Sequence, residues 1–298
     1  MEVQYPLVFF TLFLCLSSGM LLFQGILLAQ GRGTKPFHTA MIVVQLAALV
    51  IGGFSSFLHL HHWERIFNGF GHLSSGITQE LIGVVVTVVV LVVMFMMLRK
   101  GGENGRPAAA WVGILALIVG IVMGFVCAHS YYMSARPAWS NFTLYLYYYA
   151  SELVLGAAGT WLVAAAFKQD AAVTDLMAKL TCAMGVVSAI AVVVAGFFWT
   201  SIPFNDVGYS FHTTDPTAPL PDPTGALAGP LSGADAALFW GGAVVVGSLV
   251  AAVCGFFGWK KPQAALPVAA GALACSLVGG VCFRVVLYAV GVSYYVYF

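Results

Sequence analysis

Five polar side chains lie in or beside long apolar segments, where a charge needs a specific reason. They are His59, Glu80, His129, Arg284 and Tyr288. An ionisable group inside a membrane span costs at least about 2.5 kcal/mol on insertion scales, so such residues often mark functional sites. A histidine exchanges protons near neutral pH, a carboxylate accepts a proton, and an arginine stabilises a developing anion. Together these groups suit a reaction that moves protons along with electrons.

The composition is that of a membrane protein. The chain has 298 residues, of which 61% are hydrophobic and 8% charged, whereas a soluble domain has roughly 25% charged residues. Its apolar runs are continuous and long enough to cross a hydrocarbon core of ~30 Å as helices. A β-barrel would show alternating segments of about ten residues instead. We therefore expect an all-α polytopic membrane protein. The net charge of +1, without a basic patch, argues against a nucleic-acid partner.

Eight apolar segments divide the chain. They are residues 6–29, 39–58, 81–98, 107–135, 142–167, 180–200, 236–259 and 262–288. We expect one integral membrane domain over residues 1–298, and the even number of spans permits two four-helix bundles. The spacing of Gly120 and Gly124 favours close helix packing. Residues 201–235, rich in Pro, Gly, Asp and Thr, are predicted to be a surface loop rather than a span.

The basic residues predict the orientation of these spans. Nine of the twelve Lys and Arg residues follow segments one, three, five and seven, whereas the loops after segments two, four and six hold only Arg65 and Arg136. Basic loops stay in the cytoplasm. Both termini and the loop 201–235 are therefore expected to be extracytoplasmic.

This orientation brings polar groups from four helices to one depth. His59 falls at the outer end of the second segment, Glu80 at the outer start of the third, and His129 near the outer end of the fourth. Arg284 and Tyr288 come late in the eighth, which also runs outward. We therefore expect a polar pocket in the outer leaflet.

Each of these residues also has a simpler interpretation. Glu80 could interact only with the start of its own helix, and Arg284 could extend its charge to the interface. Glu152 lies near the middle of the fifth segment. It is expected either to be protonated and hydrogen-bonded or to belong to a proton route.

A quinone headgroup suits an outer-leaflet pocket of this kind, because its two carbonyl groups become hydroxyl groups when two electrons and two protons are added. The chain shows no redox-centre motif of its own. Six cysteines lie in apolar runs without a C-x-x-C pair, so no iron–sulfur cluster is expected. Electrons would therefore pass to a cofactor in another subunit.

Three blocks carry a resemblance to a known family. They are Phe57-Leu58-His59-Leu60 with Arg65-Ile66-Phe67-Asn68, Ser74-Ser75 and Glu80; Tyr131 with Pro137-Ala138-Trp139; and Arg284 with Leu287-Tyr288. In these blocks the chain resembles the membrane anchor subunits of dimethyl sulfoxide reductase. It departs from the family in being one residue shorter before Glu80 and in having Ala128-His129 where the family tends to have an arginine.

The resemblance implies an anchor that binds menaquinol, contains no haem or iron–sulfur cluster, and works only within a complex. The implied partners are an iron–sulfur subunit and a molybdopterin catalytic subunit on the extracytoplasmic face. The implied location is a bacterial or archaeal cytoplasmic membrane. The expected quinone-binding residues are His59, Arg65 and Glu80, with His129, Glu152, Arg284 and Tyr288 around them or along a proton path.

Two other functions fit parts of the pattern. His59 and His129 could be the axial ligands of a haem b in a quinol-oxidising subunit, which an absorption spectrum would reveal. A transporter would place its polar residues at the midplane, where only Glu152 lies, and uptake into proteoliposomes would support it. Related anchors of the polysulfide-reductase type share the eight-span, haem-free layout.

Overall fold

The computed structural model describes residues 3–58, 60, 62, 68, 70–101, 110–203 and 223–293. This part of the chain is helical and contains no strand. Eight helical stretches are long and apolar enough to cross a membrane. They are α1 (Tyr5–Ala29), α2 (Lys35–Phe57), α3 (Gly76–Lys100), α4 (Ala110–Ser130), α5 (Phe142–Ala166), α6 (Ala171–Thr200), η4 (Ala237–Val250) continued by α8 (Ala251–Lys260), and α9 (Ala265–Ala289), which follows the short η5 (Pro262–Ala264).

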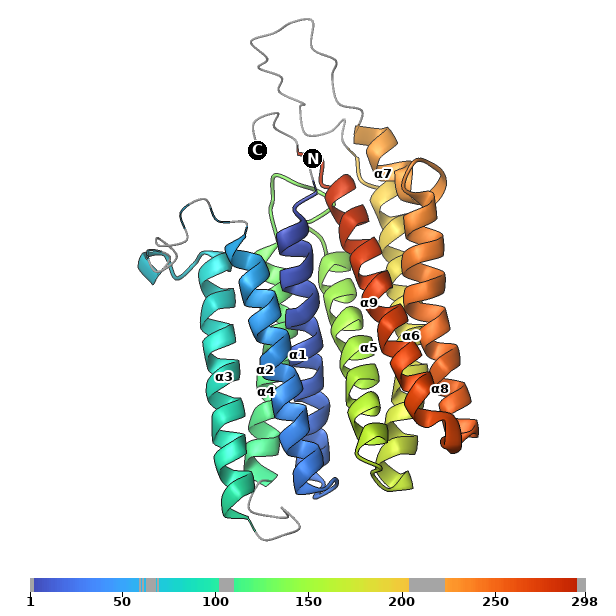
Figure 1. Cartoon of the computed structure of the whole chain (residues 1–298). Helices are drawn as coiled ribbons and strands as arrows, with labels where there is room; N and C mark the ends of the chain where they lie inside the picture. Colours follow the sequence, from blue (N-terminus) through green and yellow to red (C-terminus); the bar gives the residue numbers. More distant parts are fainter. Residues whose placement is uncertain are drawn as a thin grey trace, which may run out of the picture.

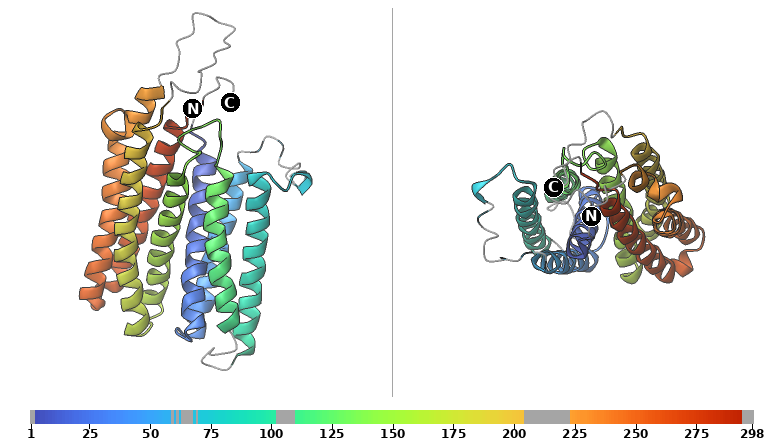
Figure 2. Two further views of the ribbon diagram at one scale, coloured as in Figure 1. Left: turned by 180° about the vertical axis from the view of Figure 1, so that it is seen from behind. Right: turned by 90° about the horizontal axis from the view of Figure 1, so that it is seen from above.

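The eight spanning stretches form two groups that stand side by side (Figure 1). Helices α1 to α4 make the first group, and α5, α6, η4–α8 and α9 make the second. Figure 2 shows the same division from behind and from above, with α1 and α5 at the junction. The all-α fold and the eight spans predicted from the sequence are confirmed.

Apolar side chains cover the outer faces of both groups. Val50, Phe54 and Ile77, for example, are 65–70% exposed. In water such a surface would be costly, because each exposed apolar group would need to be hydrated. In a bilayer the same side chains contact lipid, so this surface explains how the chain can be so apolar throughout.

Glycines allow helices to approach closely, both between the two groups and within the first group. A Cβ atom on Gly19 of α1 would lie 2.1 Å from the carbonyl oxygen of Glu152 and 2.9 Å from the Cα of Gly156, both on α5. On α4, a Cβ on Gly120 would lie 2.8 Å from Leu22, and one on Gly124 would lie 2.0 Å from Oε2 of Glu152. The close packing expected from the spacing of Gly120 and Gly124 is confirmed.

The basic residues gather at one end of the bundle, which we call the basic end. Those that the structure describes there are Arg32, Lys35, Arg99, Lys100, Lys168, Lys179, Lys260 and Lys261. Trp259 stacks with two of them, at 4.8 Å from Nζ of Lys179 and 4.0 Å from Nζ of Lys260. Helix α1 begins and α9 ends at the opposite end (Figure 1), which we call the terminal end.

Several helices begin or end at other residues than the apolar segments do, because hydropathy alone does not locate helix ends. Helix α3 begins at Gly76 rather than at residue 81, and α6 begins at Ala171 rather than at residue 180. The start of α6 is fixed by Asp170, whose carboxylate accepts a hydrogen bond from the amide of Val173 at 3.0 Å. Helix α4 ends at Ser130 rather than at residue 135, and turns follow.

The predicted surface loop 201–235 also contains a helix. Helix α7 (Pro223–Ser232) lies at the terminal end beside α6. Its Leu227 is buried, and the indole of Trp240 donates a hydrogen bond of 2.9 Å to the carbonyl of Leu231. The loop is therefore partly folded back onto the second group of helices.

Candidate functional site

A cavity of about 450 Å³ lies at the terminal end of the first helix group. Helices α1, α2, α3 and α4 enclose it, together with the turn after α4 and the end of α9. Its lining is mostly apolar: Gln4, Leu7, Phe10, Gly53, Ser56, Phe57, Leu60, Ile77, Glu80, Leu81, Val84, Ser130, Tyr131, Met133, Arg136, Trp139 and Tyr288. A few convergent polar groups in an apolar cavity of this size are typical of a small-molecule site.

Glu80 is the only carboxyl group among these lining residues. It lies one turn into α3 and is only 6% exposed. The hydroxyl of Ser130 donates a hydrogen bond of 2.7 Å to its Oε1, and the Ser130 oxygen also lies 3.0 Å from the carbonyl oxygen of Cys127. Ser130 thus fixes the orientation of the carboxyl group, which borders the cavity.

Aromatic side chains form the wall next to α9. The ring of Trp139 packs edge-on against Tyr288 at 5.5 Å and against Tyr131 at 5.9 Å. The indole N–H of Trp139 donates to the carbonyl of Leu287 at 2.8 Å, which attaches the turn after α4 to the end of α9. The hydroxyl of Tyr288 is buried and has no hydrogen-bond partner in the described part of the chain. The phenol of Tyr131 on the same wall interacts with this hydroxyl. A buried hydroxyl without a well-formed hydrogen bond is costly, so this group can still bond a ligand or a water.

Arg136 adds a positive charge to the same wall. Its guanidinium donates to the carbonyl of Gly291 and lies 5.0 Å from the ring of Trp139. Partial burial lowers the pKa of Arg136 below its usual value, but an arginine remains protonated at physiological pH. Burial raises the pKa of Tyr131 well above its usual value, so this phenol stays neutral.

The arrangement offers a proton acceptor, a cation and a free hydroxyl around an apolar space. It can hold a molecule with a polar end and a larger apolar part. It can also accept a proton from that polar end, because the Glu80 carboxyl borders the cavity.

The structure brings together only some of the residues predicted from the sequence. Glu80 and Tyr288 both line the cavity, although they are separated by more than two hundred residues. His59 and Arg65 lie outside the described residues. Phe57 and Leu60, close to His59 in the sequence, both line the cavity.

His129 lies outside the cavity lining. Its Nδ1 is 2.9 Å from the hydroxyl of Tyr145, and its ring stacks on Phe125 at 5.4 Å. This cluster joins α4 to α5 on a half-exposed face.

Arg284 and Glu152 lie deeper than the cavity, at the junction of the two helix groups. Arg284 is 1% exposed, and its guanidinium donates to Thr11, Tyr147 and Ser151 at 2.8–3.3 Å. It therefore does not extend to the interface. Glu152 is fully buried, and neither carboxyl oxygen has a hydrogen-bond partner in the described part of the chain.

Sequence reasoning missed Arg136 and Ser130. The signal for Arg136 was present, because it is one of only two basic residues in the loops at the terminal end and precedes the Pro137-Ala138-Trp139 block. Ser130 carries no such signal, since a serine at the end of an apolar helix is common.

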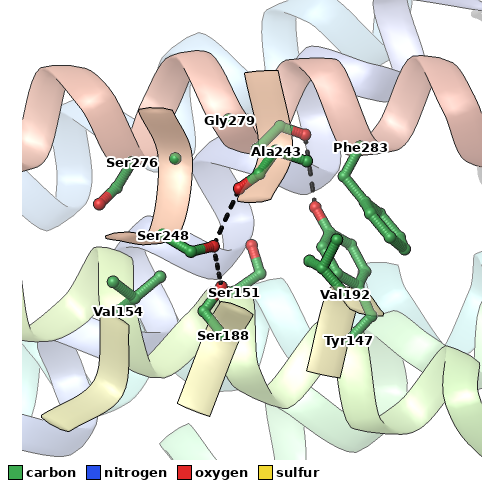
Figure 3. Close-up of a pocket in the computed structure, with 12 residues that line it drawn as sticks. Tyr147, Ser151, Val154, Ser188, Val192, Ala243, Ser248, Ser276, Gly279 and Phe283 are labelled. Atoms are coloured by element: carbon green, nitrogen blue, oxygen red, sulfur yellow. Dashed lines mark hydrogen bonds between the residues drawn. The ribbon is translucent and has the colours of Figure 1, made fainter. Parts of the chain in front are cut away.

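Two other hollows do not have the features of a site. One lies at the basic end between Lys35, Val43 and Phe167, and all its lining residues are at least partly exposed. The other lies within the second helix group and is lined by serines (Figure 3). Its volume of about 10 Å³ fits a single water. There the hydroxyls of Ser188 and Ser248 are 3.0 Å apart.

The described residues contain no group of three or more His, Cys, Asp or Glu side chains placed to hold a metal ion.

A family model, DMSO reductase anchor subunit (DmsC), matches residues 1–208. The chain belongs to this family. A comparison with curated proteins found no match.

The DmsC match confirms the resemblance inferred from the sequence. It includes α1 to α6 and therefore the blocks around Glu80 and Trp139, whereas the block with Arg284 and Tyr288 lies beyond it. As a DmsC-family anchor, the chain is a multi-pass membrane protein that associates with the catalytic and electron-transfer subunits of a DMSO reductase-type complex.

Proposed function

We propose that this anchor subunit oxidises menaquinol in the cavity beside Glu80 and passes the electrons to an iron–sulfur subunit. Oxidation of a quinol releases two electrons and two protons. The anchor has to bind the headgroup, accept its protons and hold it close to the neighbouring subunit.

The observation that carries this proposal is the combination of groups around one cavity. Glu80, Arg136 and the unpaired hydroxyl of Tyr288 border a space of about 450 Å³ whose other walls are largely apolar. Pockets for organic ligands usually measure ~300–1,000 Å³. A quinol needs such a site, since it carries two hydroxyl groups on an otherwise apolar molecule.

Each polar group can be given a distinct part in this reaction. Glu80, oriented by Ser130, accepts a proton from one quinol hydroxyl and releases it at the terminal end. The hydroxyl of Tyr288 donates a hydrogen bond to an oxygen of the headgroup. Arg136 stabilises negative charge that develops there as the protons leave.

His59 and Arg65 remain predictions that rest on the family resemblance. A histidine beside the cavity would serve as the second proton acceptor, because it exchanges protons near neutral pH. His59 lies between Leu58 and Leu60 in the sequence, and Leu60 lines the cavity.

The charge distribution supports an extracytoplasmic position for the terminal end. The basic residues of the described loops lie at the other end, and basic loops are retained in the cytoplasm. The iron–sulfur subunit, with a molybdopterin catalytic subunit, would then dock outside the cytoplasmic membrane of a bacterium or archaeon, directly above the cavity.

The proposal is tested with the purified complex and menadiol, a naphthoquinol without a tail, under anaerobic conditions. We expect the complex to oxidise menadiol, with dimethyl sulfoxide supplied first as the electron acceptor. The rate is measured from the increase in the absorbance of menadione. A complex that neither oxidises menadiol nor binds menadione would refute the proposal, whatever its acceptor.

Replacing Tyr288 with phenylalanine separates a ligand contact from a structural one. The hydroxyl has no partner in the described part of the chain, so we expect its removal to leave the thermal stability of the complex unchanged. A lost hydrogen bond of about 1 kcal/mol should weaken menadione binding about fivefold. Unchanged affinity with lower stability would assign this hydroxyl to the fold instead.

A further inference from the structure

The walls of the cavity differ in how much they are covered by the protein. At the polar wall, Glu80 is 6% exposed, and Trp139 and Tyr288 are each 3% exposed. Two other lining residues are much more exposed, Phe57 at 45% and Ile77 at 67%. The cavity is therefore closed around its polar groups and open beside α2 and α3.

The open side is built from one face of each of these two helices. The lining residues are Gly53, Ser56 and Phe57 on α2, and Ile77, Leu81 and Val84 on α3. Residues spaced by three and four positions lie on the same side of a helix, so the two faces border one space.

This opening reaches into the hydrocarbon layer. Gly53 lies four residues before the end of α2, or about 6 Å from that end at 1.5 Å per residue. Val84 lies eight residues beyond the start of α3, or about 12 Å from it. The neighbouring side chains Phe54 and Val85 are 65% and 51% exposed and apolar. A ligand that leaves the cavity here enters lipid rather than water.

We propose that the isoprenoid tail of the quinol leaves the cavity between α2 and α3, and that Gly53 determines whether a tailed quinol can bind. This inference rests on the proposed function. It adds the route by which the substrate enters from the membrane and the residue that controls this route.

Gly53 is suited to this role because the space beside it is open. A Cβ atom at Gly53 would meet no other atom of the described residues within 4 Å, whereas a Cβ on the preceding Gly52 would lie 3.2 Å from the carbonyl of Phe10. A Cβ atom at position 53 therefore fits the backbone without strain, and a larger side chain built on it would occupy the space that the tail needs.

The test compares two quinones that differ only in the tail. The purified complex is titrated with menadione and with a menaquinone of four isoprene units, and binding is followed by quenching of tryptophan fluorescence, to which Trp139 in the cavity wall contributes. For Gly53→Leu we expect the affinity for the tailed quinone to fall at least tenfold more than the affinity for menadione. Gly53→Ala should give a smaller difference between the two quinones.

Gly241→Leu is the matched control. A Cβ at Gly241 also meets nothing within 4 Å, and this residue lies on η4, outside the cavity. It should change neither affinity. If Gly53→Leu lowers the affinity for both quinones equally, or for neither, the tail route is overturned while the proposed function stands. Failure of the wild-type complex to bind either quinone would overturn both.

Discussion

Replacement of Glu80 by glutamine is expected to lower quinol-dependent turnover of the assembled complex at least 100-fold. General acid–base groups contribute roughly 10²–10⁴-fold to rates, and Glu80 is the only carboxyl group among the residues that line the cavity. Glutamine keeps the size of the side chain and can still accept a hydrogen bond from Ser130 at its amide oxygen. The substitution therefore removes proton acceptance with little change in packing. The measurement is the steady-state rate of menadiol oxidation, with complex assembly checked by co-purification.

A matched substitution separates this effect from a general loss of a carboxyl group. Asp175 lies near the start of α6 at the basic end, away from the cavity. Asp175→Asn makes the same chemical change and should leave turnover within twofold of wild type. Normal turnover in Glu80→Gln, with the complex intact, would remove Glu80 from the mechanism and leave only a binding cavity.

The parts of the fold that depend on hydrophobicity could be predicted from the sequence. Long apolar runs leave no alternative to helices in a bilayer, and the number of spans follows from counting those runs. Helix ends depend on caps and turns instead. Asp170 extends α6 beyond the apolar run, and the turns after Ser130 shorten α4.

The candidate site was partly predictable for a similar reason. An ionisable residue in an apolar segment stands out, and the alternating direction of the spans gives its depth, so Glu80 and Tyr288 could be assigned to the same level. Which side of a helix a residue faces cannot be derived from depth. His129 has a similar predicted depth but faces Tyr145, outside the cavity.

The turn after α4 was not predictable, because its position depends on contacts with a distant segment. Arg136 borders the cavity because its guanidinium bonds the carbonyl of Gly291, and Trp139 is attached to Leu287. Both contacts join residues about 150 positions apart, which no local pattern in the sequence records.

Arg284 is the residue whose removal should most reduce the stability of the fold. Its Nε donates to the hydroxyl of Thr11 at 2.9 Å, and Nη1 donates to the hydroxyl of Tyr147 at 2.8 Å. Nη2 donates to the carbonyl of Thr11 at 3.3 Å and to the sulfur of Cys15 at 3.3 Å. One guanidinium thus joins α9 to α1 and α5, and so connects the two helix groups.

We expect Arg284→Ala to destabilise the anchor by about 3 kcal/mol, because it leaves a cavity and several buried polar groups without partners. The measurement is the thermal unfolding midpoint of the purified complex, which should fall by several degrees. Arg284→Lys keeps the charge but cannot make all of these contacts, so it should restore only part of the stability. Arg99→Ala removes an exposed arginine at the basic end and should have little effect.

The same substitution should also affect the cavity, since Arg284 lies one turn before Tyr288 on α9. If Arg284 holds α9 in place, Arg284→Ala weakens menadione binding together with stability, and Arg284→Lys recovers both in parallel. Wild-type stability in Arg284→Ala would show that the two helix groups are held by their other contacts, such as the close packing of Gly19 on Gly156, without help from this buried charge.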